Sequence, residues 1–189
     1  MLVYFIRHGE SETNLKGIFA GQLDALLTEK GFAQAEALRD KLAKIRFDRV
    51  YSSDLSRAMS TARTALPDVD FTTDARLREI SVGTLAGQVS KEFRASNPDK
   101  LEVLRARDFR EFGGECERDV MTRLSEFLSE LTKEDLNTVA VFCHGGVICA
   151  ALGVALGIEL SHYKLAQPNC MVSVFELDGD FFGLESWNA

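Results

Sequence analysis

The sequence lacks the features that mark membrane, secreted and general nucleic-acid-binding proteins. No apolar run is long enough for a transmembrane helix, and the amino terminus carries neither the basic region nor the small-residue cleavage site of a secretion signal. Basic residues number 22 against 29 acidic ones, and the net charge of −7 gives no sign of a basic nucleic-acid-binding face. We therefore expect a mature, cytoplasmic protein whose partners include neither nucleic acid nor a membrane.

Cysteine pairs and linker-like sequence are also missing. The four cysteines form no CxxC pair, and two of them, Cys143 and Cys149, lie in apolar stretches where reduced, buried thiols are expected. No internal repeat, low-complexity segment or linker interrupts the chain. Its 189 residues, 46% hydrophobic and 27% charged, are enough for one sizeable core. We predict a single domain that spans residues 1–189.

Short apolar runs alternate with segments of helical periodicity. Thr28 can cap a helix whose apolar face is formed by Phe32, Ala35, Leu38, Leu42 and Ile45. The other predicted elements are strands at 3–6, 49–51, near Phe71 and at 138–143, helices at 54–66, from Asn97-Pro98, at 120–131 and at 147–156, and a hairpin at 170–177 and 181–187. This order predicts a three-layer α/β fold, with a mostly parallel central sheet, helices on both faces and a C-terminal hairpin.

Two of the three histidines directly follow predicted strands. His8 comes after the strand at 3–6 and His144 after the strand at 138–143, and each is followed by a glycine that permits close approach to a ligand. Because ligands of open α/β sheets bind beyond the carboxyl ends of the strands, both histidines are candidate site residues. A histidine in this position can be a metal ligand, a general base or a nucleophile.

Arginines accompany these histidines. Arg7 directly precedes His8, and Arg57 follows the strand at 49–51. Guanidinium groups beside imidazoles repel a divalent metal ion but bind a phosphoryl group through paired hydrogen bonds. Taken alone, Arg57 is more typical of a solvated helix residue. Together, the four side chains favour phosphoryl chemistry over a metal site.

Further short motifs occur in an order that matches a known family. They are RHGE and SETN at 7–14, GQ at 21–22, LT at 27–28, Gly31, QA at 34–35, SSDLSRA at 52–58, LREI at 77–80, Gly83, Gly87, GGE at 113–115 and HGG at 144–146. The ordered set covers nearly the whole chain and resembles the histidine phosphatase superfamily, also called the phosphoglycerate mutase-like family. In length the chain is similar to its small phosphatases of the alpha-ribazole phosphatase type.

The resemblance implies a role for each matching residue. His8 would be the nucleophile that becomes phosphorylated, and Glu79 would donate a proton to the leaving oxygen. Arg7, Arg57 and His144 would complete the catalytic set by neutralising the phosphoryl oxygens without a metal ion or other cofactor. The implied substrate-binding residues are Arg7, His8, Asn14, Gly21, Arg57, His144 and Gly145.

The chain departs from the family pattern at positions that bear on the substrate. Leu26 replaces a common proline, Leu85-Ala86 replaces a common aromatic-acidic pair, and Cys116 replaces a common serine. The last two changes are expected to affect substrate access, because we place a lid or insert at about 85–117. This region is short and lacks the Tyr-, Arg- and Lys-rich block with which phosphoglycerate mutases grip a carboxylate.

The predicted lid contains basic residues whose role the sequence leaves open. Lys91, Arg94, Arg105 and Arg107 can contact an anionic substrate or form a solvated helical face. We favour the solvated face.

The favoured function is a metal-independent phosphomonoester hydrolase that acts on a small phosphorylated metabolite through a phosphohistidine. A phosphoglycerate mutase-type phosphotransferase is the alternative, followed by a non-catalytic regulatory module that binds phosphoanions. A metallohydrolase with His8, Glu10 and His144 as ligands is disfavoured by the adjacent arginines. Phosphate-, sulfate- or vanadate-type anions are the expected pocket ligands, and the sequence leaves open whether the protein is a monomer or a homodimer.

Overall fold

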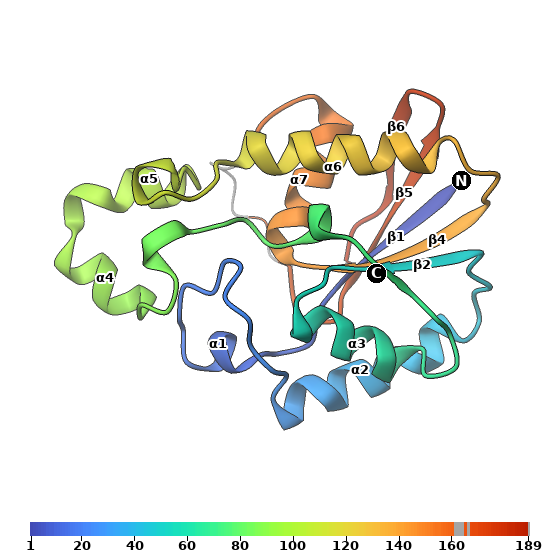
Figure 1. Cartoon of the computed structure of the whole chain (residues 1–189), viewed down its shortest axis with the longest axis horizontal. Helices are drawn as coiled ribbons and strands as arrows, with labels where there is room; N and C mark the ends of the chain where they lie inside the picture. The colour runs from blue at the N-terminus through green and yellow to red at the C-terminus, as the bar shows by residue number, and fades with distance from the viewer. Residues whose placement is uncertain (161–164, 166, 189) are drawn as a thin grey trace.

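A six-stranded sheet forms the centre of the computed structural model, which describes residues 1–160, 165 and 167–188 (Figure 1). The strands are β1 (Leu2–Arg7), β2 (Arg49–Ser52), β3 (Thr72–Thr73), β4 (Thr138–Cys143), β5 (Val172–Asp178) and β6 (Phe181–Ser186). Their order in the sheet is β3-β2-β4-β1-β5-β6. The first four strands run parallel, whereas β5 runs antiparallel to β1 and pairs with β6 as a hairpin. The structure confirms the mostly parallel sheet and its C-terminal hairpin.

Helices cover both faces of this sheet. Helices α2 (Glu29–Leu42) and α3 (Ser56–Ala65) lie on one side, and α6 (Glu117–Leu131) and α7 (Gly145–Leu156) lie on the other (Figure 1). Glycine ends α7 at its C-terminus, where Gly157 adopts the left-handed conformation with φ of 67°. The three-layer α/β architecture is therefore confirmed.

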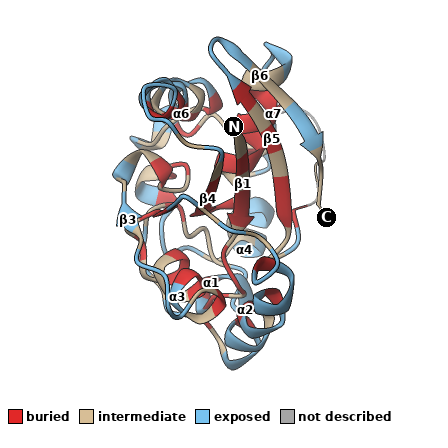
Figure 2. Cartoon of the chain, turned by 90° about the vertical axis from the view of Figure 1, so that its right-hand side faces the viewer, coloured by how far each residue is buried: buried red, intermediate tan, exposed pale blue. Residues whose placement is uncertain are grey.

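Side chains of the central strands alternate between the two layers. On β1, Val3 and Phe5 belong to the core beneath α6 and α7, whereas Ile6 belongs to the core beneath α2 and α3. Val141 and Phe142 of β4 divide in the same way, and Figure 2 shows these strands buried between the helical layers. Because both faces are covered, the strands read in the sequence as uninterrupted apolar runs.

The first long helix differs in detail from the prediction. The Thr28 side chain accepts a hydrogen bond from the N–H of Gly31 at 3.1 Å, as expected of a capping residue. The buried face, however, starts at Gly31 and not at Phe32, which is 43% exposed, and Ile45 lies beyond the end of α2. A side chain at Gly31 would bring its Cβ within 2.1 Å of the Glu10 carbonyl oxygen, so the loop after β1 packs directly on the backbone there.

Other predicted boundaries shift by a few residues. Helix α3 begins at Ser56 and not at 54, because the Asp24 carboxylate accepts hydrogen bonds from the N–H and hydroxyl of Ser56 at 2.8 and 2.6 Å. The strand expected near Phe71 is the two-residue edge strand β3. Asn97 provides no side-chain cap, and Pro98 begins a short 3-10 helix.

The segment between β3 and α6 is built from short helices. It contains α4 (Ser90–Ser96), α5 (Leu101–Arg105) and the 3-10 helices η1 (Ala75–Leu77), η2 (Gly83–Leu85), η3 (Pro98–Lys100) and η4 (Arg110–Phe112). Helices α4 and α5 project beyond the sheet at the left of Figure 1, beside α1 (Glu12–Leu15).

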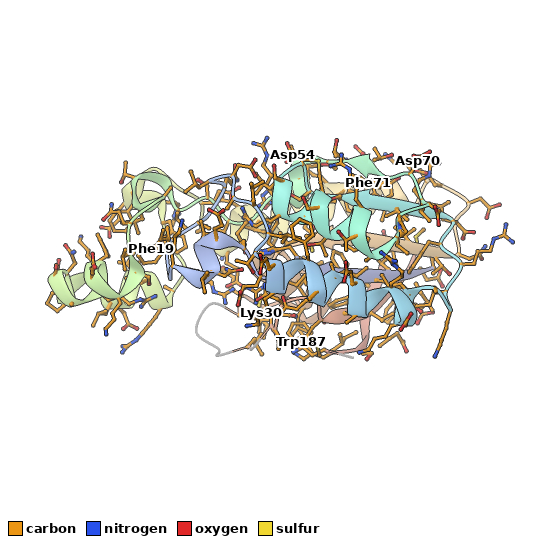
Figure 3. The ribbon with its side chains drawn as sticks, turned by 90° about the horizontal axis from the view of Figure 1, so that it is seen from below. Phe19, Lys30, Asp54, Asp70, Phe71 and Trp187 are labelled. Carbon is orange, nitrogen blue, oxygen red and sulfur yellow. The ribbon has the colours of Figure 1, made fainter. Side chains whose placement is uncertain are left out.

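Aromatic packing joins the projecting helices to the loop after β1. The rings of Phe19 and Phe93 lie 5.9 Å apart, and those of Phe93 and Phe112 lie 5.8 Å apart, all edge to face. The Phe19 N–H also donates to the Gln88 carbonyl oxygen at 2.9 Å. Figure 3 shows Phe19 between α1 and α4, where these two parts of the chain meet.

Two predictions based on composition can be compared with the structure. All four cysteines are free, and Cys143 and Cys149 are buried, as predicted. Within the described residues, no helix has the length and apolar character needed to cross a membrane.

Candidate active site

A cavity of about 380 Å³ opens at the carboxyl end of the parallel strands. Seven of the sequence-predicted site residues are among its described lining residues: Arg7, His8, Asn14, Gly21, Arg57, Glu79 and Gly145. The eighth, His144, is fully buried and does not line the cavity. Its ring centroid nevertheless lies only 5.1 Å from that of His8. The fold therefore brings together side chains from four separate parts of the chain.

The hydrogen bonds of His8 define its tautomer. Its Nδ1 lies 2.7 Å from the carbonyl oxygen of Gly9, which can only accept, so Nδ1 carries the proton. The other ring nitrogen, Nε2, then holds a lone pair. The N–H of Gly9 donates in turn to the Thr61 hydroxyl at 3.0 Å, and that hydroxyl donates to the Arg57 carbonyl oxygen at 2.7 Å. This chain of bonds fixes the His8 ring against α3 in its neutral form, with the lone pair on Nε2.

Burial and positive charge keep both imidazoles neutral. Burial, followed by the charges of Arg57 and Arg7, lowers the pKa of His8 well below its usual range. Burial, and then Arg57 and His8, lowers the pKa of His144 in the same direction. Neutral His8 is the form that has a lone pair available for attack at pH 7.

Stability should therefore depend on pH between about 7.5 and 5.5. The pKa of both histidines is lower in the folded protein, so the unfolded chain takes up more protons as pH falls through about 6.5. The free energy of unfolding should then fall by up to about 1.4 kcal/mol per pH unit for each histidine. Urea unfolding across this range measures the slope, and His144→Gln should remove about half of it. A free energy that stays constant over this range contradicts the neutral burial of these rings.

Two buried nitrogens beside His8 have no partner among the described residues. They are Nε of Arg7 and Nδ1 of His144. The Nε2 of His144 lies 2.9 Å from the Ser53 hydroxyl, and the terminal guanidinium nitrogen of Arg7 donates to the carbonyl oxygen of Gln167. Nε of Arg7 can only donate, and Nδ1 of His144 donates in the tautomer whose Nε2 accepts from the Ser53 hydroxyl. Because buried polar groups are nearly always hydrogen-bonded, these two nitrogens point to a ligand that accepts hydrogen bonds.

Arg57 connects the cavity wall to the loop after β1. It is only 1% exposed, and its guanidinium donates to the carbonyl oxygens of Gly21 and Leu23 at 2.8 and 2.9 Å. Gly21 has a φ of 48°, and a Cβ there would lie 2.7 Å from a methyl group of Val82. Only glycine fits this position, so the loop folds over the cavity with its carbonyl oxygens directed to Arg57.

The carboxylate of Glu79 is held at the start of α7. Its Oε1 accepts a hydrogen bond from the N–H of Ile80 at 2.9 Å, and Oε2 accepts one from the N–H of Gly146 at 3.2 Å. A Cβ on Gly146 would come within 2.1 Å of Glu79 Oε1. The second glycine of the HGG motif therefore makes room for this carboxylate.

An ion pair supports the loop that carries Glu79. Nε of Arg123 lies 3.0 Å from Oε1 of Glu115, and the Arg123 guanidinium also donates to the carbonyl oxygens of Arg76 and Glu79. The other Glu115 oxygen accepts from the N–H of Ser81 at 2.8 Å. Together they hold the backbone on both sides of Glu79.

The basic residues of the predicted lid divide into two groups. Lys91 and Arg105 are exposed and do not line the cavity, as expected of a solvated face. Arg94 is exposed as well, and its Nε donates to the Ser90 hydroxyl of the same helix at 3.1 Å, but it also lines the cavity. The prediction is wrong for Arg107, which lines the cavity and is half-buried with a non-helical φ of 49°. A helical pattern could not show this, because Arg107 lies just beyond the end of α5.

Two family departures lie elsewhere than expected. Leu85 is 1% exposed in the core, and Cys116 directly precedes α6, where its N–H donates to the Asp119 carboxylate at 2.8 Å. Neither residue is among the described residues that line the cavity. The structure therefore shows no direct contact through which Leu85 or Cys116 would affect substrate access.

Several supporting residues could not be found from the sequence. Each of them supports a site residue through a single oxygen: the hydroxyl of Ser53, the hydroxyl of Thr61 and the backbone carbonyl of Gln167. Their spacing in the sequence does not distinguish them from other serines, threonines and glutamines. The only signal was the SSDLSRA motif, which contains Ser53.

The geometry also bears on the metallohydrolase alternative. The Glu10 carboxylate lies 2.9 Å from the Lys30 ammonium and 3.0 Å from the Thr28 hydroxyl, and it does not line the cavity. In the described part of the chain, His8, Glu10 and His144 do not form a group of metal-binding side chains.

The chain is similar to known proteins over nearly its whole length. A model of the histidine phosphatase superfamily (branch 1) matches residues 3–189. Phosphoserine phosphatase 1 of Hydrogenobacter thermophilus is 32% identical over 181 residues, which cover 92% of this chain and 85% of that protein. The 2,3-bisphosphoglycerate-dependent phosphoglycerate mutase of Brucella melitensis is 33% identical over 188 residues, 93% of this chain and 91% of that protein.

Solved structures show the same likeness. The mycobacterial glucosyl-3-phosphoglycerate phosphatase in complex with VO3 superposes with a TM-score of 0.91 at 28% identity. The match covers 100% of this chain and 98% of that one. The similarity therefore extends over the whole fold, including the strands and loops that build the cavity.

Proposed function

Because this chain belongs to branch 1 of the histidine phosphatase superfamily, we propose that it hydrolyses phosphomonoesters of small metabolites through a phosphohistidine at His8. One observation carries the proposal. The proton of His8 is held on Nδ1 by Gly9, which leaves Nε2 with a lone pair in a cavity lined by Arg7 and Arg57. Phosphatase names among the relatives support the same chemistry.

In the first step, Nε2 of His8 attacks phosphorus. An N–P bond forms as the ester P–O bond breaks, and the proton of a protonated Glu79 moves to the departing oxygen. Arg7, Arg57 and the free nitrogen of His144 donate hydrogen bonds to the phosphoryl oxygens, whose charge they neutralise.

In the second step, water attacks the phosphohistidine. The Glu79 carboxylate, now ionised, takes the proton of the water as the new O–P bond forms and the N–P bond breaks. The products are inorganic phosphate and His8 with its lone pair restored, and Glu79 is protonated for the next cycle.

Positive side chains supply the charge neutralisation in this scheme, so no metal ion is required. Release of phosphate from a panel of phosphomonoesters should survive exhaustive chelation and fall in the presence of vanadate, which mimics the geometry of phosphoryl transfer. Loss of activity on chelation, with recovery on addition of Zn²⁺ or Mn²⁺, supports a metallohydrolase instead.

The segment at 85–117 serves as the lid in this proposal. It contributes Arg94, Leu104, Arg107 and Phe109 to the cavity wall, and it closes on Phe19 of the loop after β1. The lid therefore determines which leaving groups the cavity accepts.

A second candidate function is a phosphoglycerate mutase-type transfer. The observation in its favour is the Brucella melitensis mutase, which matches 93% of this chain. In a mutase, the phosphohistidine returns its phosphoryl group to a hydroxyl of the product and not to water. Measured side by side, phosphate release from 3-phosphoglycerate faster than its conversion to 2-phosphoglycerate supports the hydrolase, and the reverse supports the mutase.

The ion pair behind Glu79 leads to a prediction about proton transfer. Arg123→Ala frees the backbone at Glu79 and should lower kcat/KM for an alkyl phosphate by roughly 10- to 100-fold, because misplacement of a catalytic group by a fraction of an ångström is costly. For p-nitrophenyl phosphate, whose leaving group needs no proton, the loss should be several times smaller. Arg118→Ala, on the same helix but paired with Glu159 at the surface, is the matched control. Equal losses on both substrates contradict a positioning role for Arg123.

A further inference from the structure

We propose that Arg107, assisted by Arg94, forms a second anion-binding subsite, so that the substrate carries a negatively charged group in addition to its ester phosphate. The inference rests on the proposed phosphomonoesterase function and specifies the class of substrate. A second phosphate or a carboxylate has the required chemistry, and both accept hydrogen bonds from a guanidinium group.

The charges that line the cavity exceed what one phosphoryl group needs. The described lining contains four arginines, Arg7, Arg57, Arg94 and Arg107, and one carboxylate, Glu79. In the proposed function, Arg7 and Arg57 line the cavity with His8 and bind the phosphoryl group. Two guanidinium groups remain on the lid, in a protein whose net charge is −7.

Within the described residues, three basic side chains of the lid are paired with carboxylates and three are not: Lys91, Arg94 and Arg107. Of the unpaired three, only Arg94 and Arg107 line the cavity. Lys100, Arg105 and Arg110 each pair with a carboxylate, at 2.9, 3.0 and 2.6 Å. Within the described part of the chain, Arg94 and Arg107 have no such ion pair. Arg94 lies over the ring of Phe19 at 5.8 Å, and its Nε donates to the Ser90 hydroxyl at 3.1 Å. Burial disfavours the charged form of Arg107, but the nearby Cys149, Glu79 and Glu117 outweigh it and raise its pKa.

Backbone strain gives an independent indication at Arg107. The N–H of Ala106 donates to Glu102 and that of Asp108 donates to Val103, the bonds that close a helix end around a left-handed residue. Arg107 is that residue, with a φ of 49°. Glycine is the usual residue at this position, and non-glycine residues held there are concentrated at functional sites.

The surroundings hold Arg107 in the cavity wall. On one side Leu104 is buried, and on the other side Phe109 is buried and its N–H donates to the Glu115 carbonyl oxygen at 3.0 Å. Both apolar side chains line the same cavity. The second subsite therefore combines a fixed cation, Arg107, with an apolar wall. Its residues belong to the segment at 85–117, whereas His8 follows β1.

Matched pairs of substrates test the proposal. Each pair differs by one anionic group: 3-phosphoglycerate against glycerol 3-phosphate, 6-phosphogluconate against sorbitol 6-phosphate, and fructose 1,6-bisphosphate against fructose 6-phosphate. The wild type should show kcat/KM at least about tenfold higher for the doubly anionic member of one or more pairs, the size expected of a charged hydrogen bond. The pair with the largest preference shows whether the second anion is a carboxylate or a phosphate.

Arg107→Gly is the decisive variant, because glycine suits the left-handed backbone. Its melting temperature should equal or exceed that of the wild type. The preference for the doubly anionic substrate should fall by at least about fivefold, because the variant lacks the charged hydrogen bond that Arg107 makes to the second anion. Arg105→Ala, a substitution at the exposed last residue of α5, should leave the preference unchanged.

The outcomes separate this proposal from the function on which it rests. Absence of a preference in every pair, or an equal loss on both members in Arg107→Gly, overturns the second subsite while hydrolysis remains. Failure to hydrolyse any of these esters or p-nitrophenyl phosphate overturns the phosphomonoesterase function itself, and the subsite with it.

Discussion

His8→Ala is expected to lower kcat by about 10⁴-fold or more on every phosphomonoester, because a covalent mechanism has no alternative once its nucleophile is removed. The loss should be the same for activated and unactivated esters, since no phosphohistidine can form from either. Steady-state phosphate release on alkyl and p-nitrophenyl phosphates measures it.

Controls must separate this loss from misfolding, because His8 is 3% exposed and its removal leaves a cavity. His8→Asn is the smaller perturbation, and it should be equally inactive with a near-ultraviolet circular dichroism spectrum like that of the wild type. Full hydrolysis by a folded His8→Ala protein shows that the nucleophile is another residue.

Glu79→Gln is expected to give the second largest effect, and it should depend on the leaving group. Glutamine keeps the size of the side chain but cannot deliver a proton. For alkyl phosphates, whose alkoxides leave poorly, kcat/KM should fall by ~10²–10⁴-fold. For p-nitrophenyl phosphate the loss should be much smaller, because kcat/KM reports the transfer to His8 and that leaving group departs as a stable anion.

A matched substitution makes the Glu79 result specific. Glu36→Gln, at an exposed position of α2, should leave both substrates unaffected. Equal losses on the two substrates in folded Glu79→Gln would show that Glu79 holds the pocket together and that another group is the proton donor.

Much of the fold is predictable because its signals are local. Buried strands such as β1 and β4 read as apolar runs, and His8 and His144 follow them directly. Ligands bind at the carboxyl ends of parallel strands, and this rule alone predicts that both histidines lie near one site.

The parts that the sequence does not predict depend on contacts between distant segments. Asp24 moves the start of α3 through a bond across 32 positions, and Arg123 reaches the Glu79 backbone across 44. Every residue type has a backbone carbonyl oxygen, so the sequence does not show that the one of Gln167 accepts a hydrogen bond from Arg7. For Arg107 a helical pattern favours a solvated face, because such a pattern carries no information about the left-handed residue that ends the helix.

The phosphohistidine is tested most directly by trapping it. Wild-type protein is mixed with radiolabelled p-nitrophenyl phosphate, quenched within milliseconds in alkaline denaturant, digested and mapped by mass spectrometry. We expect a label that is stable to base and labile to acid, located on the peptide that contains His8 and absent from His8→Ala. A label on another peptide, or one that resists acid and is lost in base, would contradict phosphoryl transfer through His8.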